Sequence, residues 1–346
     1  MYYNWKETTN TEELKIVCNL IKNGEIVIFP TETVYGIGAN AFDEKAVGKI
    51  FMAKGRPSDN PLIVHIADKR MITDIAKEIT EVEQKLIDHF MPGPFTLILK
   101  KTDKIPNIVS AGLETVAIRM PNHVIARGII AFSGVPIAAP SANISGKPSG
   151  TTVEDIRKEL EGKVSAIVDG GETEIGLEST VVKVIDEIPC ILRPGKISVE
   201  DIRNVIGVAE LGNGIFKPID ESEEVESPGL KHKHYAPNKP AQLMYSENEN
   251  DLIFEINRLI KSYKGDVILL GFEEHREKII ISEQRFINLG SKENLEQIAQ
   301  NLYSALRKSD ELAGQLIIIE GVKKEGLGIA IMNRLLRSCG YQYEEF

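Results

Sequence analysis

The chain has 346 residues, of which 42% are hydrophobic and 27% charged, and its formal net charge at pH 7 is −10. The length predicts about two domains, and the composition is typical of a globular protein. The acidic balance disfavours a protein whose main ligand is a nucleic-acid backbone, although a few converging cations can still bind small anions.

Neither membrane insertion nor secretion is expected. No apolar stretch approaches the roughly 18 residues that cross a bilayer, and the start MYYNWKETTN lacks the basic and apolar regions of a secretory signal. Three widely spaced cysteines, Cys18, Cys190 and Cys339, do not outline a disulfide framework or a zinc site. We therefore expect a cytoplasmic protein.

From residue 25 to about 205, short apolar runs alternate with helical patterns. Several runs are continuously apolar, which indicates strands buried on both faces. The predicted strands are EIVIFP (25–30), PLIVHI (61–66), FTLILKK (95–101), TVAIRMP (115–121), VPIAAPSAN (135–143), SAIVDGG (165–171) and STVVKVI (179–185). Helices are predicted within DEKAVGKIFMAK (43–54) and VEQKLIDHF (82–90). This is the pattern of a mixed α/β domain.

Residues 217–240 hold four prolines, an acidic cluster and no apolar periodicity, which predicts a linker. A second α/β pattern follows. Its predicted elements are AQLMYS (241–246), a helix near 249–262, DVILLGF (266–272), a helix near 291–308, QLIIIEG (315–321) and a last helix through IAIMNRLLRSC (329–339). We predict a first domain over 1–212, a linker over 213–240 and a second domain over 241–346.

Polar residues follow several of the predicted strands. Because ligands bind outside the carboxyl ends of strands in open α/β sheets, these residues are candidates for one site. They are Thr31, Thr33, Tyr35, Arg119, Ser141 and Asn143, together with Lys54 and Arg56 in KGRPSDNPLIVH (54–65). The alternative for each single position is an ordinary turn residue. The chain has neither a G-x-x-x-x-G-K-[ST] loop nor G-x-G-x-x-G opening a helix.

SGKPSGTTVEDI (145–156) predicts a helix start, since Thr151 and Glu154 have capping-box spacing. Gly146, Ser149 and Gly150 would then precede a helix amino terminus, where free N–H groups favour phosphate. A well-capped structural helix would look the same. The KHKH stretch at 231–234 could suggest a metal, but two histidines in a linker without a third ligand are more often plain polar residues.

Long stretches of the chain resemble one family. They are PTETVYGIGANAFDEKAVGKIFMAKGRPSDNPLIVHI, MPGPFTLILKK, VAIRMP, APSANISGKPSGTT, GLESTVVKV, LRPG and SPGLKHKHYAP, and the closing GLGIAIMNRLLRSCG. In this order they resemble the threonylcarbamoyl-AMP synthases, the YrdC/Sua5 family, in its long two-domain form. The resemblance implies a twisted mixed YrdC-like sheet with a large cationic cavity, followed by a smaller Rossmann-like domain.

The resemblance also implies an activity. L-threonine, bicarbonate and ATP, the last with Mg²⁺, would give threonylcarbamoyl-AMP and pyrophosphate. The product would pass to a separate transferase that makes N6-threonylcarbamoyladenosine in tRNA, without stable tRNA binding by this chain. No protein metal ligands are assigned.

The family's motifs carry over onto individual residues here. The Lys-x-Arg and Ser-x-Asn pairs, which mark the nucleotide site, are Lys54, Arg56, Ser141 and Asn143. The expected ATP contacts are Arg56, Asn60, Thr115, Ser141, Ser149, Arg193 and, from a linker that folds back over the site, Tyr235. The expected threonine pocket is Thr33, His65, Arg119, Ala139 and Ser179, with Arg119 facing the carboxylate.

Two other functions stay open at this point. A cationic cavity could bind double-stranded RNA, which a gel shift with a steep salt dependence would reveal. Carbamoyl-phosphate chemistry is found with a related domain in hydrogenase-maturation proteins, but this chain lacks their acylphosphatase and zinc-finger regions.

Overall fold

The computed structural model describes residues 1–218, 226–227 and 234–346, and these divide into two compact units. Of the described residues, the first unit holds 1–145, 149–215 and 226–227, and the second holds 146–148, 216–218 and 234–346. The acidic run expected at 221–226 and the KHKH stretch lie largely outside the described residues. No helix of the described part is long and apolar enough to cross a membrane.

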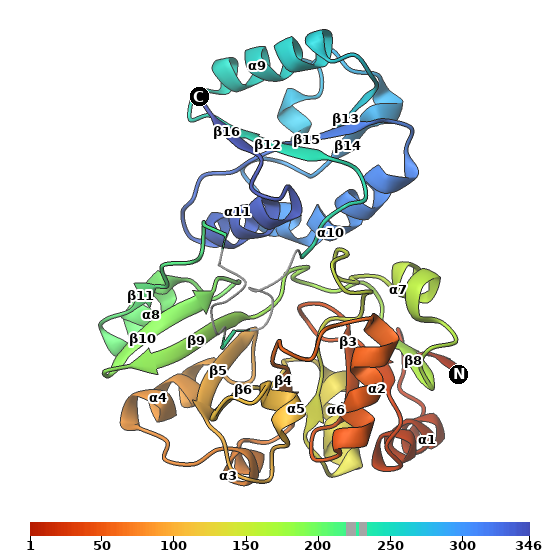
Figure 1. Cartoon of the computed structure of the whole chain (residues 1–346), viewed down its shortest axis with the longest axis vertical. Helices are drawn as coiled ribbons and strands as arrows, with labels where there is room; N and C mark the ends of the chain where they lie inside the picture. The colour runs from red at the N-terminus through yellow and green to blue at the C-terminus, as the bar shows by residue number, and fades with distance from the viewer. Residues whose placement is uncertain (219–225, 228–233) are drawn as a thin grey trace. The chain divides into compact units, whose positions relative to one another are not determined.

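The first unit is built on a mixed sheet of 11 strands in the order β1-β8-β2-β3-β7-β4-β6-β5-β9-β10-β11 (Figure 1). The strands are β1 (Tyr2–Asn4), β2 (Val27–Phe29), β3 (Gly36–Asn40), β4 (Ile63–His65), β5 (Phe95–Lys100), β6 (Thr115–Arg119), β7 (Ile137–Ala138), β8 (Ala166–Asp169), β9 (Thr180–Ile185), β10 (Ile188–Arg193) and β11 (Glu210–Leu211). β4 and β6 are parallel neighbours, whereas β2–β3, β3–β7 and β7–β4 are antiparallel.

Helices cover both faces of this sheet. Successive residues of a strand point to opposite faces, so one strand contributes side chains to both cores. Val27 and Phe29 pack with α1 (Thr11–Lys22) and α6 (Val124–Ser133) in one core. Ile28 of the same strand packs in the other core. The other helices of the unit are α2 (Glu44–Lys54), α3 (Ile72–Ile75), α4 (Glu81–Phe90), α5 (Asn107–Ser110), α7 (Val153–Leu160) and α8 (Val199–Ile206), with the 3₁₀ turn η1 (Lys69–Met71).

The second unit is a five-stranded parallel sheet in the order β14-β13-β15-β12-β16. Its strands are β12 (Ala241–Tyr245), β13 (Val267–Gly271), β14 (Phe286–Asn288), β15 (Leu316–Glu320) and β16 (Tyr343–Glu345). Figure 1 shows α9 (Glu249–Ser262) on one face and α10 (Leu295–Glu311) and α11 (Leu327–Ser338) on the other. The 3₁₀ turns η2 (Glu273–His275) and η3 (Glu283–Arg285) follow β13.

The two-domain α/β prediction is confirmed, and every predicted apolar run contains a strand. Two helix starts differ from the prediction. The helix expected at Thr151 is capped by Thr152, whose side chain accepts from the Asp155 amide, so its cap lies one residue later than predicted. The helix expected near 291 begins at Leu295, because Asn294 provides its cap.

Candidate functional site

The sequence predicts that the site residues lie together at the carboxyl ends of the strands, on one edge of the sheet. The structure does not place them that way. β2 and β7 run antiparallel to β4 and β6, so their carboxyl ends lie at opposite edges of the mixed sheet. That reason for convergence was therefore wrong. The residues are connected instead by the loops that follow the strands and by cross-strand pairs.

His65 and Arg119 are direct partners, because β4 and β6 pair in parallel with these residues in register. Neighbours of this kind point to the same face of a sheet. Arg119 is 3% exposed, and its Nη1 donates to Thr33 Oγ1 at 2.8 Å. Its Nη2 lies 2.8 Å from Oε1 of Glu32, a carboxylate only 5% exposed. This places a buried, oriented guanidinium beside two of the expected threonine contacts.

Ser179 continues the same group. Thr96 pairs with Arg119 across β5 and β6, and its hydroxyl lies 2.7 Å from Ser179 Oγ. Arg193, 4% exposed, donates through Nη2 to the Ser179 carbonyl at 3.0 Å and to its hydroxyl at 3.2 Å. Ala139 is bonded through its amide to the Ile63 carbonyl at 2.9 Å. The expected threonine pocket is thus one connected set of contacts.

Lys54 organises the Ser-x-Asn segment. This lysine at the end of α2 is 1% exposed, and its Nζ donates to the carbonyls of Ser141 at 2.5 Å and Asn143 at 2.6 Å. Ser141 Oγ donates to Asn143 Oδ1 at 2.6 Å. Gly55 ends the helix in the left-handed conformation, which a glycine adopts without steric cost. Lys54 therefore holds a loop in place as well as contributing charge.

Arg56 and Asn60 lie on the turn that follows. Arg56 is half-buried, and its Nη2 donates to the carbonyls of Asn60 at 3.1 Å and Pro61 at 3.2 Å. Asn60 is 2% exposed, yet its side-chain Oδ1 accepts no hydrogen bond among the described residues. A buried carbonyl of this kind costs free energy unless a ligand donates to it.

Three loops are joined by backbone hydrogen bonds around these side chains. The Tyr35 amide donates to Gly150 O at 3.0 Å, and the Ala142 amide donates to Tyr35 O at 2.7 Å. The Gly176 amide donates to Thr33 O at 3.1 Å. Ser149, fully buried, donates to Glu178 Oε1 at 2.5 Å. The segments near 31–35, 141–142, 149–150 and 173–179 form one framework.

Two further expected ATP contacts, Thr115 and Tyr235, have described partners outside these loops. Thr115 begins β6, the strand that ends at Arg119, and its hydroxyl donates to Glu226 at 3.3 Å. Tyr235 belongs to the second unit, where its ring stacks on Tyr303 at 5.3 Å and lies 5.5 Å from the Arg334 guanidinium.

Sequence reasoning missed Glu32, Thr96 and Glu178. Glu32 lies in PTET and Glu178 in GLEST, two of the stretches that carry the family resemblance, but the sequence-based prediction assigns no role to either acid. Each is buried and bonded to a predicted site residue. An acid is rarely buried unless it is paired, but that burial is visible only in the fold, so the sequence carried no signal for these roles.

The electrostatics of the site keep its histidines neutral. Burial and then the positive charge of Arg119 lower the pKa of His65 to about 3. Burial also lowers the pKa of His123, which precedes α6, although Glu32 opposes the shift. His65 is therefore an uncharged neighbour of Arg119 at physiological pH.

The described residues contain no group of three or more His, Cys, Asp or Glu side chains that could hold a metal ion. Mg²⁺ that serves phosphate chemistry needs only one or two protein oxygens, because phosphates and water complete its shell. Ser149 Oγ and Glu178 Oε1, which are hydrogen-bonded to each other, are oxygens of the kind that such a metal accepts.

Two family models cover nearly the whole chain. The first, the Sua5, YciO and YrdC model described as "Telomere recombination", matches residues 19–195. The second, described as "Threonylcarbamoyl-AMP synthase, C-terminal domain", matches residues 197–340.

Relatives match over the full length. Threonylcarbamoyl-AMP synthase of Pyrococcus abyssi is 43% identical over 346 residues, covering 98% of this chain and 97% of the relative. That of Bacillus subtilis is 45% identical, covering 96% and 94%. A crystal structure of P. abyssi Sua5 complexed with L-threonine matches with a TM-score of 0.93 at 41% identity, covering 100% of this chain and 99% of that one.

The fold and the two matched models define a two-domain protein of the Sua5 type, with a YrdC-like unit followed by a Sua5 C-terminal domain. The chain belongs to the threonylcarbamoyl-AMP synthase family.

Proposed function

We propose that the chain converts L-threonine, bicarbonate and ATP into threonylcarbamoyl-AMP and pyrophosphate, for N6-threonylcarbamoyladenosine formation in tRNA. One observation carries this furthest. The buried Arg119 guanidinium is oriented by Thr33 and Glu32 in a chain 41% identical to a protein solved with L-threonine. A guanidinium in a fixed orientation is well suited to bind a carboxylate through two hydrogen bonds.

The reaction needs cations and hydrogen-bond donors more than a protein nucleophile. The threonine amine and bicarbonate give a carbamate with loss of water. A carbamate oxygen then attacks the α-phosphate, the bond to the β-phosphate oxygen breaks, and pyrophosphate leaves. All participants are or become anions, so positioning and charge stabilisation supply most of the catalysis.

The residues divide between the two substrates. Arg119 would bind the threonine carboxylate, with Thr33, His65, Ala139 and Ser179 around it. Because His65 is uncharged, Arg119 would be the cation that faces this carboxylate. The ATP contacts would come from Arg56, Asn60, Thr115, Ser141, Ser149, Arg193 and Tyr235. Lys54 and Asn143 would complete the catalytic group. A bound Mg²⁺ would neutralise phosphate charge, and Ser149 and Glu178 would supply its protein oxygens.

The linker is proposed to close the site. In this proposal residues 1–212 are the catalytic domain, 213–240 fold over it and carry Tyr235, and 241–346 form the C-terminal domain. Exclusion of water would protect the labile adenylate. Removing residues 213–346 should then sharply reduce product yield, and unchanged turnover would remove the idea.

The first test is pyrophosphate release from ATP, with threonine and bicarbonate omitted in turn. Release that requires both, with serine a poor substitute, supports the synthase. Release that is indifferent to threonine contradicts it. The product should then support tRNA modification only when a separate transferase is added, since the proposal gives this chain no transfer step.

A further inference from the structure

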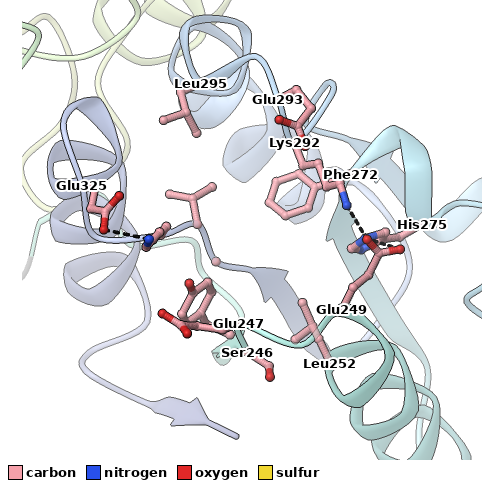
Figure 2. A pocket seen from close by; sticks show the side chains of 14 residues that line it. Ser246, Glu247, Glu249, Leu252, Phe272, His275, Lys292, Glu293, Leu295 and Glu325 are labelled. Atoms are coloured by element: carbon pink, nitrogen blue, oxygen red, sulfur yellow. Dashed lines mark hydrogen bonds and ion pairs between the residues drawn. The ribbon is translucent and has the colours of Figure 1, made fainter.

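A pocket lies within the C-terminal unit, far along the chain from the residues discussed above. Its volume is about 470 Å³, and it is lined at the carboxyl ends of β12, β13 and β15 (Figure 2). Its walls combine apolar side chains with carboxylates. The apolar part includes Tyr245, Leu252, Phe272, Leu295 and Val322.

The position of this pocket follows from the topology. β12 and β15 are adjacent parallel strands, but β12 leads into α9 on one face and β15 into α11 on the other. The chain therefore opens a crevice between the two strand ends. This is the place where open parallel sheets bind their ligands.

The pocket is unsuited to phosphate. The turn after β12 reads Ser-Glu-Asn-Glu (246–249) and contains no glycine that would let a phosphate approach the backbone. The Asn248 side chain already accepts the Asn250 amide at the start of α9. Glu247 and Glu249 place negative charge at the same end of the helix.

The lining is acidic overall. Four glutamates and two lysines line the pocket. Glu249 pairs with Lys292 and also with Lys278, and Lys323 pairs with Glu325 at 2.8 Å. Glu247 and Glu293 are exposed and make no ion pair among the described residues, so these two carboxylates are the negative groups of the lining that a ligand can engage.

A buried histidine lies at the inner wall. His275 is 2% exposed, and its Nδ1 is 2.5 Å from Oε2 of the fully buried Glu320. His275 lines the pocket, and its Nε2 makes no hydrogen bond among the described residues but forms an ion pair with Glu249 Oε1 at 3.5 Å, marked by a dashed line in Figure 2. Burial alone would lower the pKa of His275, but Glu320 and Glu249 outweigh it and raise that pKa. The two carboxylates that flank the ring therefore favour the positive form of His275 itself.

We propose that this pocket binds a small organic amine in its cationic form. The amine would pair with Glu247 and Glu293, its carbon skeleton would pack on Phe272, Leu252 and Leu295, and a polar group would reach His275 Nε2. Carboxylates beside aromatic and aliphatic walls provide both charge pairing and cation–π contact for such a molecule.

The test is isothermal titration of the full-length protein with spermidine at low ionic strength. One equivalent should bind, and the double variant Glu247→Gln/Glu293→Gln should raise Kd at least about tenfold. His275→Gln should also weaken binding. Glu344→Gln removes an equal charge from an exposed position of the same unit and should leave Kd unchanged.

Three results would overturn the proposal. In the first, Glu344→Gln weakens spermidine binding as much as the double variant does. In the second, the double variant binds spermidine as tightly as the wild type. In the third, the protein binds adenosine or AMP selectively and does not bind spermidine. The double variant should also keep wild-type pyrophosphate release, which distinguishes this site from the proposed reaction.

Discussion

Glu32 and Arg119 form an ion pair of 2.8 Å in the interior of the first unit, with side chains 5% and 4% exposed. Both oxygens of Glu32 and Nη2 of Arg119 lack hydrogen bonds of good geometry among the described residues. The pair is thus held mainly by charge. A ligand carboxylate could engage the same guanidinium.

Glu32→Gln should destabilise the protein by about 3–5 kcal/mol, because it leaves a buried guanidinium without its anion. Threonine should then raise the melting temperature more in the variant than in the wild type, since its carboxylate replaces the missing charge. The single tryptophan, buried Trp5, reports unfolding of this unit by fluorescence. The matched control is Glu12→Gln, at an exposed position of α1. A smaller threonine effect in Glu32→Gln would instead assign Glu32 to the threonine ammonium group.

Lys54→Met should lower both stability and pyrophosphate release. The change removes the charged donor to the Ser141 and Asn143 carbonyls, and hydrogen bonds to charged groups are worth about 1.5–3 kcal/mol. Lys45→Met, an exposed position on the same helix, should change neither quantity. Urea unfolding and steady-state kinetics measure the two effects. Normal stability with lost activity would limit Lys54 to a direct role at the substrates.

Arg56→Ala should reduce adenylate formation roughly ten- to a hundred-fold, from the loss of one charged contact worth about 1.5–3 kcal/mol. Arg56→Lys should fall between the variant and the wild type, since lysine keeps the charge without the planar fork. Arg70→Ala, at a fully exposed ion pair, is the control. Near-normal kinetics in Arg56→Ala would show that the nucleotide lies elsewhere.

The pH dependence of stability should contain a contribution from His65. Its pKa is about 3 in the folded state against 6.5 in a model peptide, so the unfolded chain binds more protons between these values. The contribution is complete above pH 6.5 and is lost as pH falls, by about 2 kcal/mol between pH 7 and pH 5. His65→Gln should remove that part of the dependence in urea unfolding followed by Trp5. His89→Gln, on the exposed side of α4, should not.

The strands were predictable where they are continuously apolar, because burial on both faces leaves a plain signal. β3 was missed, since GIGAN has too few large side chains. A Cβ at Gly38 would meet the Phe29 ring at 2.5 Å, so its glycine reflects close packing that only the sheet order reveals.

Arg119 and Ser141 could be selected because they lie at or just after the ends of predicted strands. The family motifs identified the other candidate site residues. The Glu32–Arg119 pair could not be predicted, because it depends on which loop crosses which strand. The direction of β4 and β6 relative to β2 likewise follows from pairing and not from local pattern. The pocket of the C-terminal unit could not be predicted from the sequence, since its acids and His275 lie on separate connections of the C-terminal sheet.

The backbone bonds that join Tyr35 to Gly150 and Thr33 to Gly176 have a consequence for how the protein folds. Each closes a chain loop of more than a hundred residues, and long closures form late because their entropy is lost before contacts compensate for it. No short segment of the chain can therefore assemble the site on its own. During synthesis, substrate binding should begin only after the segment through residue 193 has emerged and the sheet has closed around it.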